Sequence, residues 1–391
     1  MTFSSRPDRP LGIAEQQRRA IARSEGKLSI VAQNGANLFG GAERALVAIL
    51  AGLQQRGHIV TLCCNHDLVA NEAVRRFVPA IVLPLRGDAM FGDVWRFARF
   101  LKRENPDAML FGSFKKIWLG GMAARLAKVP RTVARVGLAT DTPRRLKYRI
   151  ALEHWVDTVV LNAESMRGAF LAGMPDRYDA GRVTRIYSGV APLQVTKTRE
   201  AMRRELGIPV DAHVIGTLAR LAGQKRLERV VGLTALLPGV HCIIAGEGSH
   251  RERIEERIRE LGVGDRVHML GHREDRGNVL NALDLYVVAS NLEGLSNAML
   301  EALSVGIPVV STPVSGAHEA LAPLADGRVP GVVIDGTEPE QLAAAVGALL
   351  ADPSARARMG EAARERIREE FDYERGIDRW EAVLRGERVE R

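Results

Sequence analysis

The sequence predicts an α/β protein built from two doubly wound, Rossmann-like domains. The first observation is length, because 391 residues suggest two or three domains at roughly 150 residues each. The second is that short apolar runs alternate with amphipathic segments of helical length, which is typical of parallel sheets covered on both faces. The third is that twelve such runs are too many for one doubly wound sheet around a single core.

Each apolar run is predicted to be a buried strand. A TIM barrel is the main alternative, but it requires eight units and would place all its active loops on one face. The six N-terminal runs are 28–32, 59–63, 80–83, 108–111, 132–136 and 158–161, and the six C-terminal runs are 213–217, 240–245, 267–270, 285–289, 308–311 and 332–334.

Three further segments set the expected domain organisation. Residues 1–27 are polar and contain no apolar segment of a secretory signal, so we interpret them as a flexible N-terminal extension. The stretch 188–198 contains Gly189 and Pro192 and lacks apolar periodicity, so the domain boundary and a hinge are expected there. This divides the chain into domains at 28–190 and 191–372. Helices are expected at 338–350, 353–370 and 373–386.

The composition limits the classes of partner. The net charge of +8 is uneven: residues 1–190 carry +13 and residues 191–391 carry −5. A basic half can attract nucleic acid, anionic lipid headgroups or acidic small molecules. An aromatic content of 5% weakens the nucleic-acid interpretation, because single strands bind by stacking on aromatic rings. Three cysteines without a CxxC motif favour a reducing, cytoplasmic compartment and argue against zinc.

Several common motifs are missing from the sequence. There is no P-loop, no HExxH, no GxSxG and no complete GxGxxG, so a nicotinamide enzyme is disfavoured. There is also no Asp-x-Asp pair, which often holds a divalent metal against a nucleotide diphosphate. No run of 18 apolar residues predicts a membrane-spanning helix.

The most informative segment is 284–319. A predicted strand ends near Ser290, a glycine loop follows, and a helix is expected from about Leu295 to Val305. The first-turn amides of that helix, expected at Leu295, Ser296 and Asn297, have no intrahelical partners and therefore form an anion site with the helix dipole.

Two glutamates, Glu293 and Glu301, bracket this anion site. Eight residues of helix would separate them by roughly 12 Å, which is too far for an acid/base pair acting on one bond. The spacing suits a long ligand with a diphosphate on the helix N-terminus and sugar hydroxyls on either side. The alternative is that Glu293 only interacts with the helix dipole and Glu301 is a solvated helix residue.

The segment EGLSNAMLEALSVGIPVVSTPVSGAHE resembles the signature of the retaining family 4 glycosyltransferases, which have the GT-B fold. Three further segments resemble that family in the same order: NGANLFGGAERALVAIL, GTLARLAGQKRLERV, and AGEGSHRERIEERIRELGVGDRVHMLGH. The resemblance covers roughly residues 28–386. It implies two Rossmann-like domains that face a central cleft, with helix 373–386 returning to the N-terminal domain.

The resemblance assigns roles residue by residue. It implies a catalytic set of Arg220 and Lys225, which clamp the diphosphate, and Glu293, which binds the donor sugar. It implies a ribose contact for Glu301 and a base contact for Gly271 and His272. The remaining donor-binding residues are Gly246, Gly294, Leu295, Ser296 and Asn297, and the acceptor or phosphate loop comprises Gly40, Gly41 and Lys115.

The expected activity is transfer of a sugar, with retention, from a nucleoside diphosphate sugar to a lipid-linked or cell-surface polysaccharide. No cofactor and no metal are expected, because Arg220, Lys225 and helix amides stand where other enzymes use a metal. One departure is the lack of a histidine after the strand 132–136, where many members carry one. An inactive sugar-nucleotide-binding or assembly protein, a sugar-nucleotide epimerase and a nucleic-acid-binding protein are the alternatives.

Two basic segments of the first half predict contact with an anionic membrane. Residues 131–149 carry a net charge of +5, and residues 114–118 mix Lys115 and Lys116 with apolar side chains including Trp118. We therefore expect a peripheral association with the inner face of the cytoplasmic membrane. The alternative is an ordinary solvated basic surface.

Overall fold

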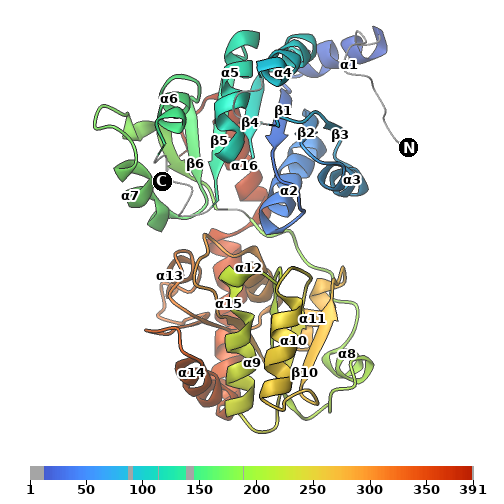
Figure 1. Ribbon diagram of the computed structural model, residues 1–391, viewed down its shortest axis with the longest axis vertical. Helices are drawn as coiled ribbons and strands as arrows, with labels where there is room; N and C mark the ends of the chain where they lie inside the picture. The colour runs from blue at the N-terminus through green and yellow to red at the C-terminus, as the bar shows by residue number, and fades with distance from the viewer. Residues whose placement is uncertain (1–12, 87–90, 113, 138–144, 188, 390–391) are drawn as a thin grey trace. The chain divides into compact units, whose positions relative to one another are not determined.

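Figure 1 shows a computed structural model, which describes residues 13–86, 91–112, 114–137, 145–187 and 189–389. The chain divides into two compact units, one formed by Met1–Gly189 with Glu374–Arg391 and the other by Val190–Tyr373. Each unit contains a parallel sheet with helices on both faces, as the alternating apolar runs predict (Figure 1). The doubly wound α/β architecture is confirmed.

The described residues of unit 1 form a seven-stranded sheet in the order β3-β2-β1-β4-β5-β6-β7. All six strands predicted for this half are present. The prediction missed β7, because a three-residue strand with one apolar side chain gives no apolar run. The strands are β1 (Ser29–Asn34), β2 (Ile59–Cys64), β3 (Ala80–Val82), β4 (Ala108–Phe111), β5 (Arg131–Val136), β6 (Thr158–Leu161) and β7 (Val183–Arg185).

Helices α4, α5 and α6 cover one face of this sheet (Figure 1). Their apolar sides meet the strands in a buried cluster that contains Phe97, Phe111, Ile117 and Leu161. The helices of unit 1 are α1 (Ile13–Ser24), α2 (Gly41–Gln55), α3 (Asp67–Arg75), α4 (Phe91–Glu104), α5 (Ile117–Ala127), α6 (Leu146–His154), α7 (Arg167–Ala172) and, from Glu374 onward, α16 (Tyr373–Arg385).

The expectation of a flexible extension over 1–27 does not hold for α1. Arg19 of this helix is buried and forms a salt bridge with Glu104 of α4, with 2.6 Å between Nη2 and Oε2. Arg19 also donates to the carbonyl of Glu104. A buried guanidinium requires a partner, and the partner lies 85 residues away, so composition alone could not reveal this contact.

Helix α16 packs against the end of α2 and the start of β2 through polar contacts. Arg56 binds Glu374 and Asp378, and the Nε2 atom of His58 lies 3.2 Å from Glu381. The amide of Leu28 donates to Nδ1 of His58, so that nitrogen is unprotonated. Burial is the largest effect on His58 and lowers its pKa, although Glu381 acts in the opposite direction.

We expect His58 to make unit 1 less stable in mild acid. Because its pKa is lower in the folded state, the unfolded chain binds the proton more readily, and stability falls as the pH drops through and below about 6.5. Urea unfolding of wild type and His58→Gln, followed at pH 7.5, 6.5 and 5.5, checks this. The stability advantage of wild type should shrink as the pH falls, and a constant difference would contradict the assignment.

The described residues of unit 2 form a six-stranded sheet in the order β10-β9-β8-β11-β12-β13. All six strands predicted for this half are present. The strands are β8 (His213–Leu218), β9 (Val240–Ala245), β10 (Val267–Gly271), β11 (Leu285–Val288), β12 (Val309–Ser311) and β13 (Gly331–Val333). The helices are α8 (Arg199–Glu205), α9 (Leu227–Leu236), α10 (Arg251–Glu260), α11 (Arg276–Asn281), α12 (Asn297–Val305), α13 (Ala317–Ala320), α14 (Pro339–Ala351) and α15 (Pro353–Glu370).

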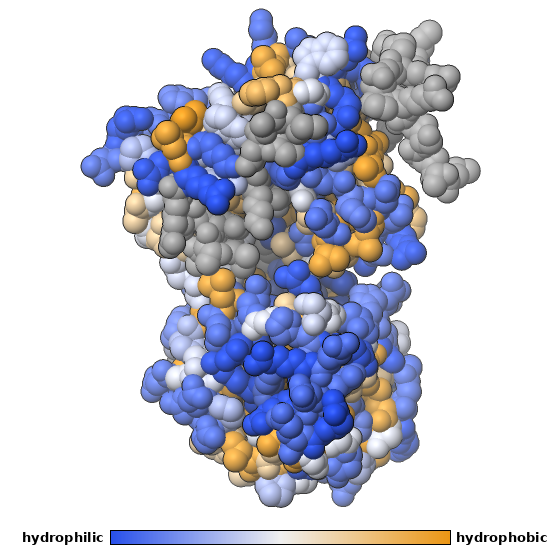
Figure 2. Space-filling view, viewed as in Figure 1, coloured by the Kyte–Doolittle hydropathy of each residue, from blue (hydrophilic) through white to orange (hydrophobic). Residues whose placement is uncertain are grey.

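The strand order of unit 2 indicates at which edge of its sheet a ligand binds. The strand order reverses between β8 and β11, and ligands of open parallel sheets bind beyond the carboxyl ends of the strands at such a point. Helix α10 belongs to the outer layer, and its strongly hydrophilic surface is visible in Figure 2. No helix in the described part of either unit is both long and apolar enough to cross a bilayer.

Candidate active site

The predicted donor residues of unit 2 all follow carboxyl ends of strands. Arg220 and Lys225 follow β8, Gly246 follows β9, and Gly271 ends β10, while the loop after β11 carries Glu293 and leads into α12. Because the strands are parallel, their carboxyl ends meet at one edge of the sheet. The topology therefore brings these segments to the edge at which β8 and β11 are neighbours.

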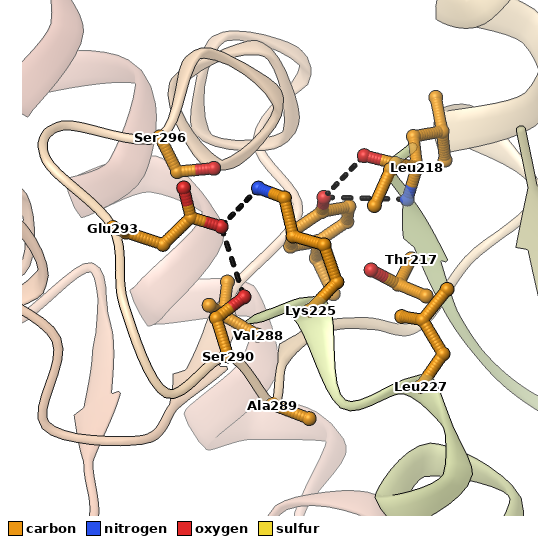
Figure 3. A pocket seen from close by; sticks show the side chains of 11 residues that line it. Thr217, Leu218, Lys225, Leu227, Val288, Ala289, Ser290, Glu293 and Ser296 are labelled. Atoms are coloured by element: carbon orange, nitrogen blue, oxygen red, sulfur yellow. Dashed lines mark hydrogen bonds and ion pairs between the residues drawn. The ribbon is translucent and has the colours of Figure 1, made fainter. Parts of the chain in front are cut away.

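A small pocket at this edge contains an ion pair between Lys225 and Glu293. Figure 3 shows the two side chains pointing toward each other, with Nζ of Lys225 paired with Oε1 of Glu293. The hydroxyl of Ser290 donates to the same carboxylate oxygen at 2.9 Å. Only 17% of the Lys225 side chain and 9% of the Glu293 side chain are exposed. The pocket lining also includes Thr217, Leu218, Tyr286, Val288 and Ser296.

The loops that carry the pair are fixed to each other. Lys225 ends a short 3-10 helix, Gly223–Lys225, and the carbonyl of Gln224 accepts a hydrogen bond from the amide of Asn291 at 2.9 Å. Arg229 of α9 donates to the carbonyl of Ala289. These contacts hold the loop after β8 against the loop after β11. The ammonium group of Lys225 is therefore held at a defined position rather than on a free surface chain.

Glu301 forms a second buried ion pair, one that the sequence did not reveal. Its Oε2 atom accepts from Nε of Arg276 at 2.7 Å, and the Glu301 residue is 7% exposed. Arg276 begins α11, just beyond β10, whereas Glu301 lies within α12. The alternative of a solvated helix residue is therefore excluded for Glu301.

Each glutamate keeps one carboxylate oxygen for a ligand. Oε1 of Glu293 and Oε2 of Glu301 are occupied by their cations, while the other oxygen of each makes no hydrogen bond to any residue that the structure describes. Neither of these two oxygens is fully buried, so each is accessible to a ligand. A hydroxyl group can therefore donate to each glutamate without breaking its ion pair.

Helix α12 begins two residues later than predicted. Its first residue is Asn297, and Ser296 is the N-cap, with no side-chain capping hydrogen bond. Leu295 and Gly294 thus lie in the preceding buried loop, and the first-turn amides are those of Asn297, Ala298 and Met299. The prediction erred because the apolar run gives the period of the helix but not its start. The predicted anion site would therefore be formed by the amides of Asn297, Ala298 and Met299.

Gly246 allows the turns after β8 and β9 to approach closely. Its φ of 146° is unfavourable for other residues, and a Cβ atom here would lie 1.9 Å from the carbonyl oxygen of Ala219. Its amide donates to the carbonyl of Gly271 at 2.7 Å, which links β9 to β10. Arg220 and His272 are exposed on this edge, and neither side chain has a hydrogen-bond partner among the described residues.

Tyr286 supports the pocket from below rather than reacting in it. Its hydroxyl donates to the carbonyl of Leu218 at 3.1 Å and accepts from the amide of the same residue. Burial raises the pKa of Tyr286 to about 12, so the phenol stays protonated at neutral pH. Four residues were not predicted from the sequence: Tyr286, Ser290, Arg229 and Arg276. Ser290 lies in the loop after β11 and Arg276 begins the helix after β10, and both are places where such residues can be sought.

The three predicted residues of the acceptor or phosphate loop belong to unit 1. Gly40 caps α2, and its amide donates to Glu43 at 2.9 Å, so this helix start carries its own capping carboxylate. Gly41 is the first residue of α2. Lys115 lies in the 3-10 helix Phe114–Lys116 beyond β4.

Two family models match the chain. The model described as Glycosyl transferases group 1 matches residues 198–366, and the model described as Glycosyltransferase Family 4 matches residues 39–192. Together they span most of both units. The chain belongs to glycosyltransferase family 4. The resemblance of the motif around Glu293 and Glu301 is thereby confirmed at the level of the family.

Similar proteins cover the chain to different extents. The lipopolysaccharide core biosynthesis glycosyltransferase LpsE of Rhizobium meliloti is 27% identical over 363 residues, which is 88% of this chain and 96% of LpsE. The D-inositol 3-phosphate glycosyltransferase of Mycolicibacterium smegmatis is 31% identical over 55% of this chain. That match spans about half of the second relative, 50% of its length.

Solved structures share the fold. HepE of Anabaena, crystallised with UDP and glucose, superposes with a TM-score of 0.81 at 20% identity, over 92% of this chain and 99% of HepE. WaaG, a glycosyltransferase involved in lipopolysaccharide biosynthesis, gives a TM-score of 0.67 at 19% identity, over 91% and 100% of the two chains. The fold is thus that of the GT-B glycosyltransferases.

Proposed function

We propose that this glycosyltransferase moves a sugar, with retention, from a nucleoside diphosphate sugar to a lipid-linked or polysaccharide acceptor of the lipopolysaccharide type. The observation that carries the proposal is the edge of unit 2 at which three charged residues gather: Lys225 after β8, Glu293 after β11 and Glu301 within α12. Each of the two glutamates is ion-paired through one carboxylate oxygen and has the other oxygen available to a ligand. The names of LpsE and WaaG support the acceptor class, and the UDP complex of HepE supports the donor class.

The chemistry assigns each residue a task. The acceptor hydroxyl oxygen bonds to the anomeric carbon as the bond between that carbon and the diphosphate oxygen breaks. The hydroxyl proton leaves with the nucleoside diphosphate, on which negative charge develops. Lys225, Arg220 and the first-turn amides of α12 stabilise that charge, which is the largest electrostatic change of the reaction. The free oxygen of Glu293 accepts from a donor-sugar hydroxyl, and the free oxygen of Glu301 accepts from the ribose.

A transfer assay tests this function. The protein is incubated with UDP-glucose, UDP-galactose or GDP-mannose and a truncated lipopolysaccharide core, and the product is identified by mass spectrometry. Proton NMR of the new linkage gives its anomeric configuration, and retention predicts the configuration of the donor. Hydrolysis without transfer from every donor, or an inverted linkage, would contradict the proposal.

We expect activity without a divalent metal. Within the described residues, no group of three or more His, Cys, Asp or Glu side chains is placed to hold a metal ion. Lys225 is instead positioned by its ion pair to provide the positive charge. Turnover in 5 mM EDTA should match turnover in buffer alone. Loss of activity that manganese or magnesium restores would contradict the assignment.

We further propose that unit 1 docks on an anionic membrane through the outer side of α4 and α6. Phe91 and Trp95 of α4 are 70% and 61% exposed, and Leu146 of α6 is 70% exposed. Arg99 lies over the Trp95 ring, 4.7 Å from its centroid. Exposed aromatic residues beside cations are typical of interfacial helices. The earlier expectation for Trp118 is wrong, because that ring packs against Trp155 and the core.

Binding to vesicles should depend on this face. Wild type is expected to sediment with vesicles containing anionic lipid at low salt and much less at 0.5 M salt, because the charges are screened. The variant Phe91→Ser/Trp95→Ser should lose most of the binding, and Leu236→Ser, an exposed apolar residue of unit 2, serves as the matched control. Equal sedimentation of all three proteins would contradict docking through α4 and would indicate that α4 is an ordinary solvent-exposed helix.

A further inference from the structure

Unit 1 has its own reversal of strand order, between β1 and β4, at the carboxyl edge of its sheet. Ligands of open parallel sheets bind at such points. The residues beyond these strands include Gly35 and Lys116, and Arg86 follows β3, the edge strand on the far side of β2. None of these three residues belongs to the donor site described above.

Gln33, near the end of β1, is a buried polar residue with no partner among the described residues. It is 1% exposed, and neither its Nε2 nor its Oε1 atom makes a hydrogen bond within that part of the chain. Its register places it beside Cys63 of β2 and Phe111 of β4, and neither side chain offers a strong partner. An unpaired amide in such surroundings is costly, and native structures keep few of them. A ligand hydroxyl, which both donates and accepts, would satisfy both atoms.

Lys116 crosses the strand ends at Gly35, two residues after Gln33 in the chain. Its stem packs over Gly35, where a Cβ atom would lie 2.3 Å from Cγ of Lys116. Its Nζ donates to the carbonyl of Arg86 at 3.1 Å, on the far side of β1 and β2. Among the residues that the structure describes, the partner of the ammonium group is thus this neutral carbonyl. The Arg86 side chain is exposed and has no partner among the described residues, while the nearby carboxylate of Asp93 is already paired with Arg96.

We infer that the carboxyl edge of β1 and β4 binds an acidic sugar, with Lys116 and Arg86 holding its anionic group and Gln33 a neighbouring hydroxyl. This inference rests on the proposed function, because it assigns an anionic chemistry to the acceptor of the proposed transfer. Binding exchanges the carbonyl partner of Lys116 for a phosphate or carboxylate, which forms a stronger, charge-assisted hydrogen bond. The displaced lysine leaves the strand end at Gly35 open to the sugar ring, and Gln33 is the polar side chain just before it in β1.

Saturation-transfer NMR with glucose 6-phosphate, glucuronate and glucose as probes tests the inference. Wild type should give strong signals with at least one of the two anionic sugars and at most weak signals with glucose, and their comparison separates phosphate from carboxylate recognition. Lys116→Ala and Arg86→Ala should each reduce the anionic signal at least five-fold. Gln33→Met should weaken it while the melting temperature stays equal or rises, because an unpaired amide is removed. Lys102→Ala, an exposed lysine of α4, should bind like wild type.

Every variant is also titrated with UDP-glucose and GDP-mannose by thermal shift, which reports on unit 2. Donor binding together with no preference for anionic sugars, or with variants that bind them like wild type, would overturn the inference and leave the proposed function standing. Absence of donor binding in wild type would count against the proposed function itself. Gln33→Met that lowers the melting temperature would show that the amide is satisfied in the folded protein and would contradict its role.

Discussion

Replacing Lys225 with alanine is expected to lower kcat by about 10²–10³-fold, the loss typical when one preorganised group that stabilises transition-state charge is removed. Nucleoside monophosphate binding should change far less, because the lysine acts on charge that appears as the diphosphate leaves. Initial rates at saturating donor, with monophosphate affinity from calorimetry, separate the two effects.

Two controls protect this prediction. Lys225→Ala leaves the carboxylate of Glu293 with the Ser290 hydroxyl alone, so circular dichroism and melting temperature must show that unit 2 remains folded. Lys197→Ala removes another ion-paired lysine of unit 2, one that binds Glu205, and should leave the rate unchanged. Near-normal turnover of Lys225→Ala would remove Lys225 from the catalytic set.

Replacing Glu301 with alanine is expected to raise the KM for the donor by about 10- to 100-fold. A hydrogen bond to a charged group contributes about 1.5–3 kcal/mol, and each 1.4 kcal/mol is a factor of ten. The effect should fall on KM more than on kcat, because the ribose lies away from the breaking bond. Arg276, which holds the opposite oxygen of Glu301, is a positioning residue, and Arg276→Ala should produce a smaller effect in the same direction.

A donor without the ribose 2′ and 3′ hydroxyls provides the matched control. If Glu301 binds the ribose, wild type should lose as much affinity with the dideoxy donor as Glu301→Ala loses with the normal donor. The variant should then bind both donors equally. If Glu301→Ala loses further affinity with the dideoxy donor, so that the two losses of affinity add, Glu301 does not bind the ribose and its pairing with Arg276 is structural.

The apolar runs predicted twelve of the thirteen described strands, because buried parallel strands are nearly continuous in apolar residues. The same pattern could not fix where α12 begins. Gly294, Leu295 and Ser296 are buried in the loop before it, so burial there does not mark helix. The short strand β7 was not predicted for the opposite reason, since its sequence contains no apolar run.

Ion pairs between residues far apart in the chain could not be predicted from the sequence. Glu293 and Glu301 stood out by their motif, but nothing in their spacing shows that Lys225 and Arg276 hold one oxygen of each. The polar composition around Arg19 predicted a flexible segment, because it does not reveal the salt bridge to Glu104. The sequence suggested that Trp118 faces a membrane, whereas Trp118 packs against Trp155, and Phe91 and Trp95 of α4 are among the exposed aromatic residues.

The central claim is that unit 2 holds a nucleoside diphosphate sugar between Lys225 and Glu301, and a thermal-shift series tests it most directly. Wild type, Lys225→Met and Glu301→Ala are melted with a panel of nucleoside diphosphate sugars and the matching monophosphates. A ligand at 100 times its Kd adds about 2.7 kcal/mol to the stability of the domain that binds it. We predict a clear rise in melting temperature with at least one diphosphate sugar, reduced in both variants. No rise with any donor, or an equal rise in all three proteins, would contradict the account.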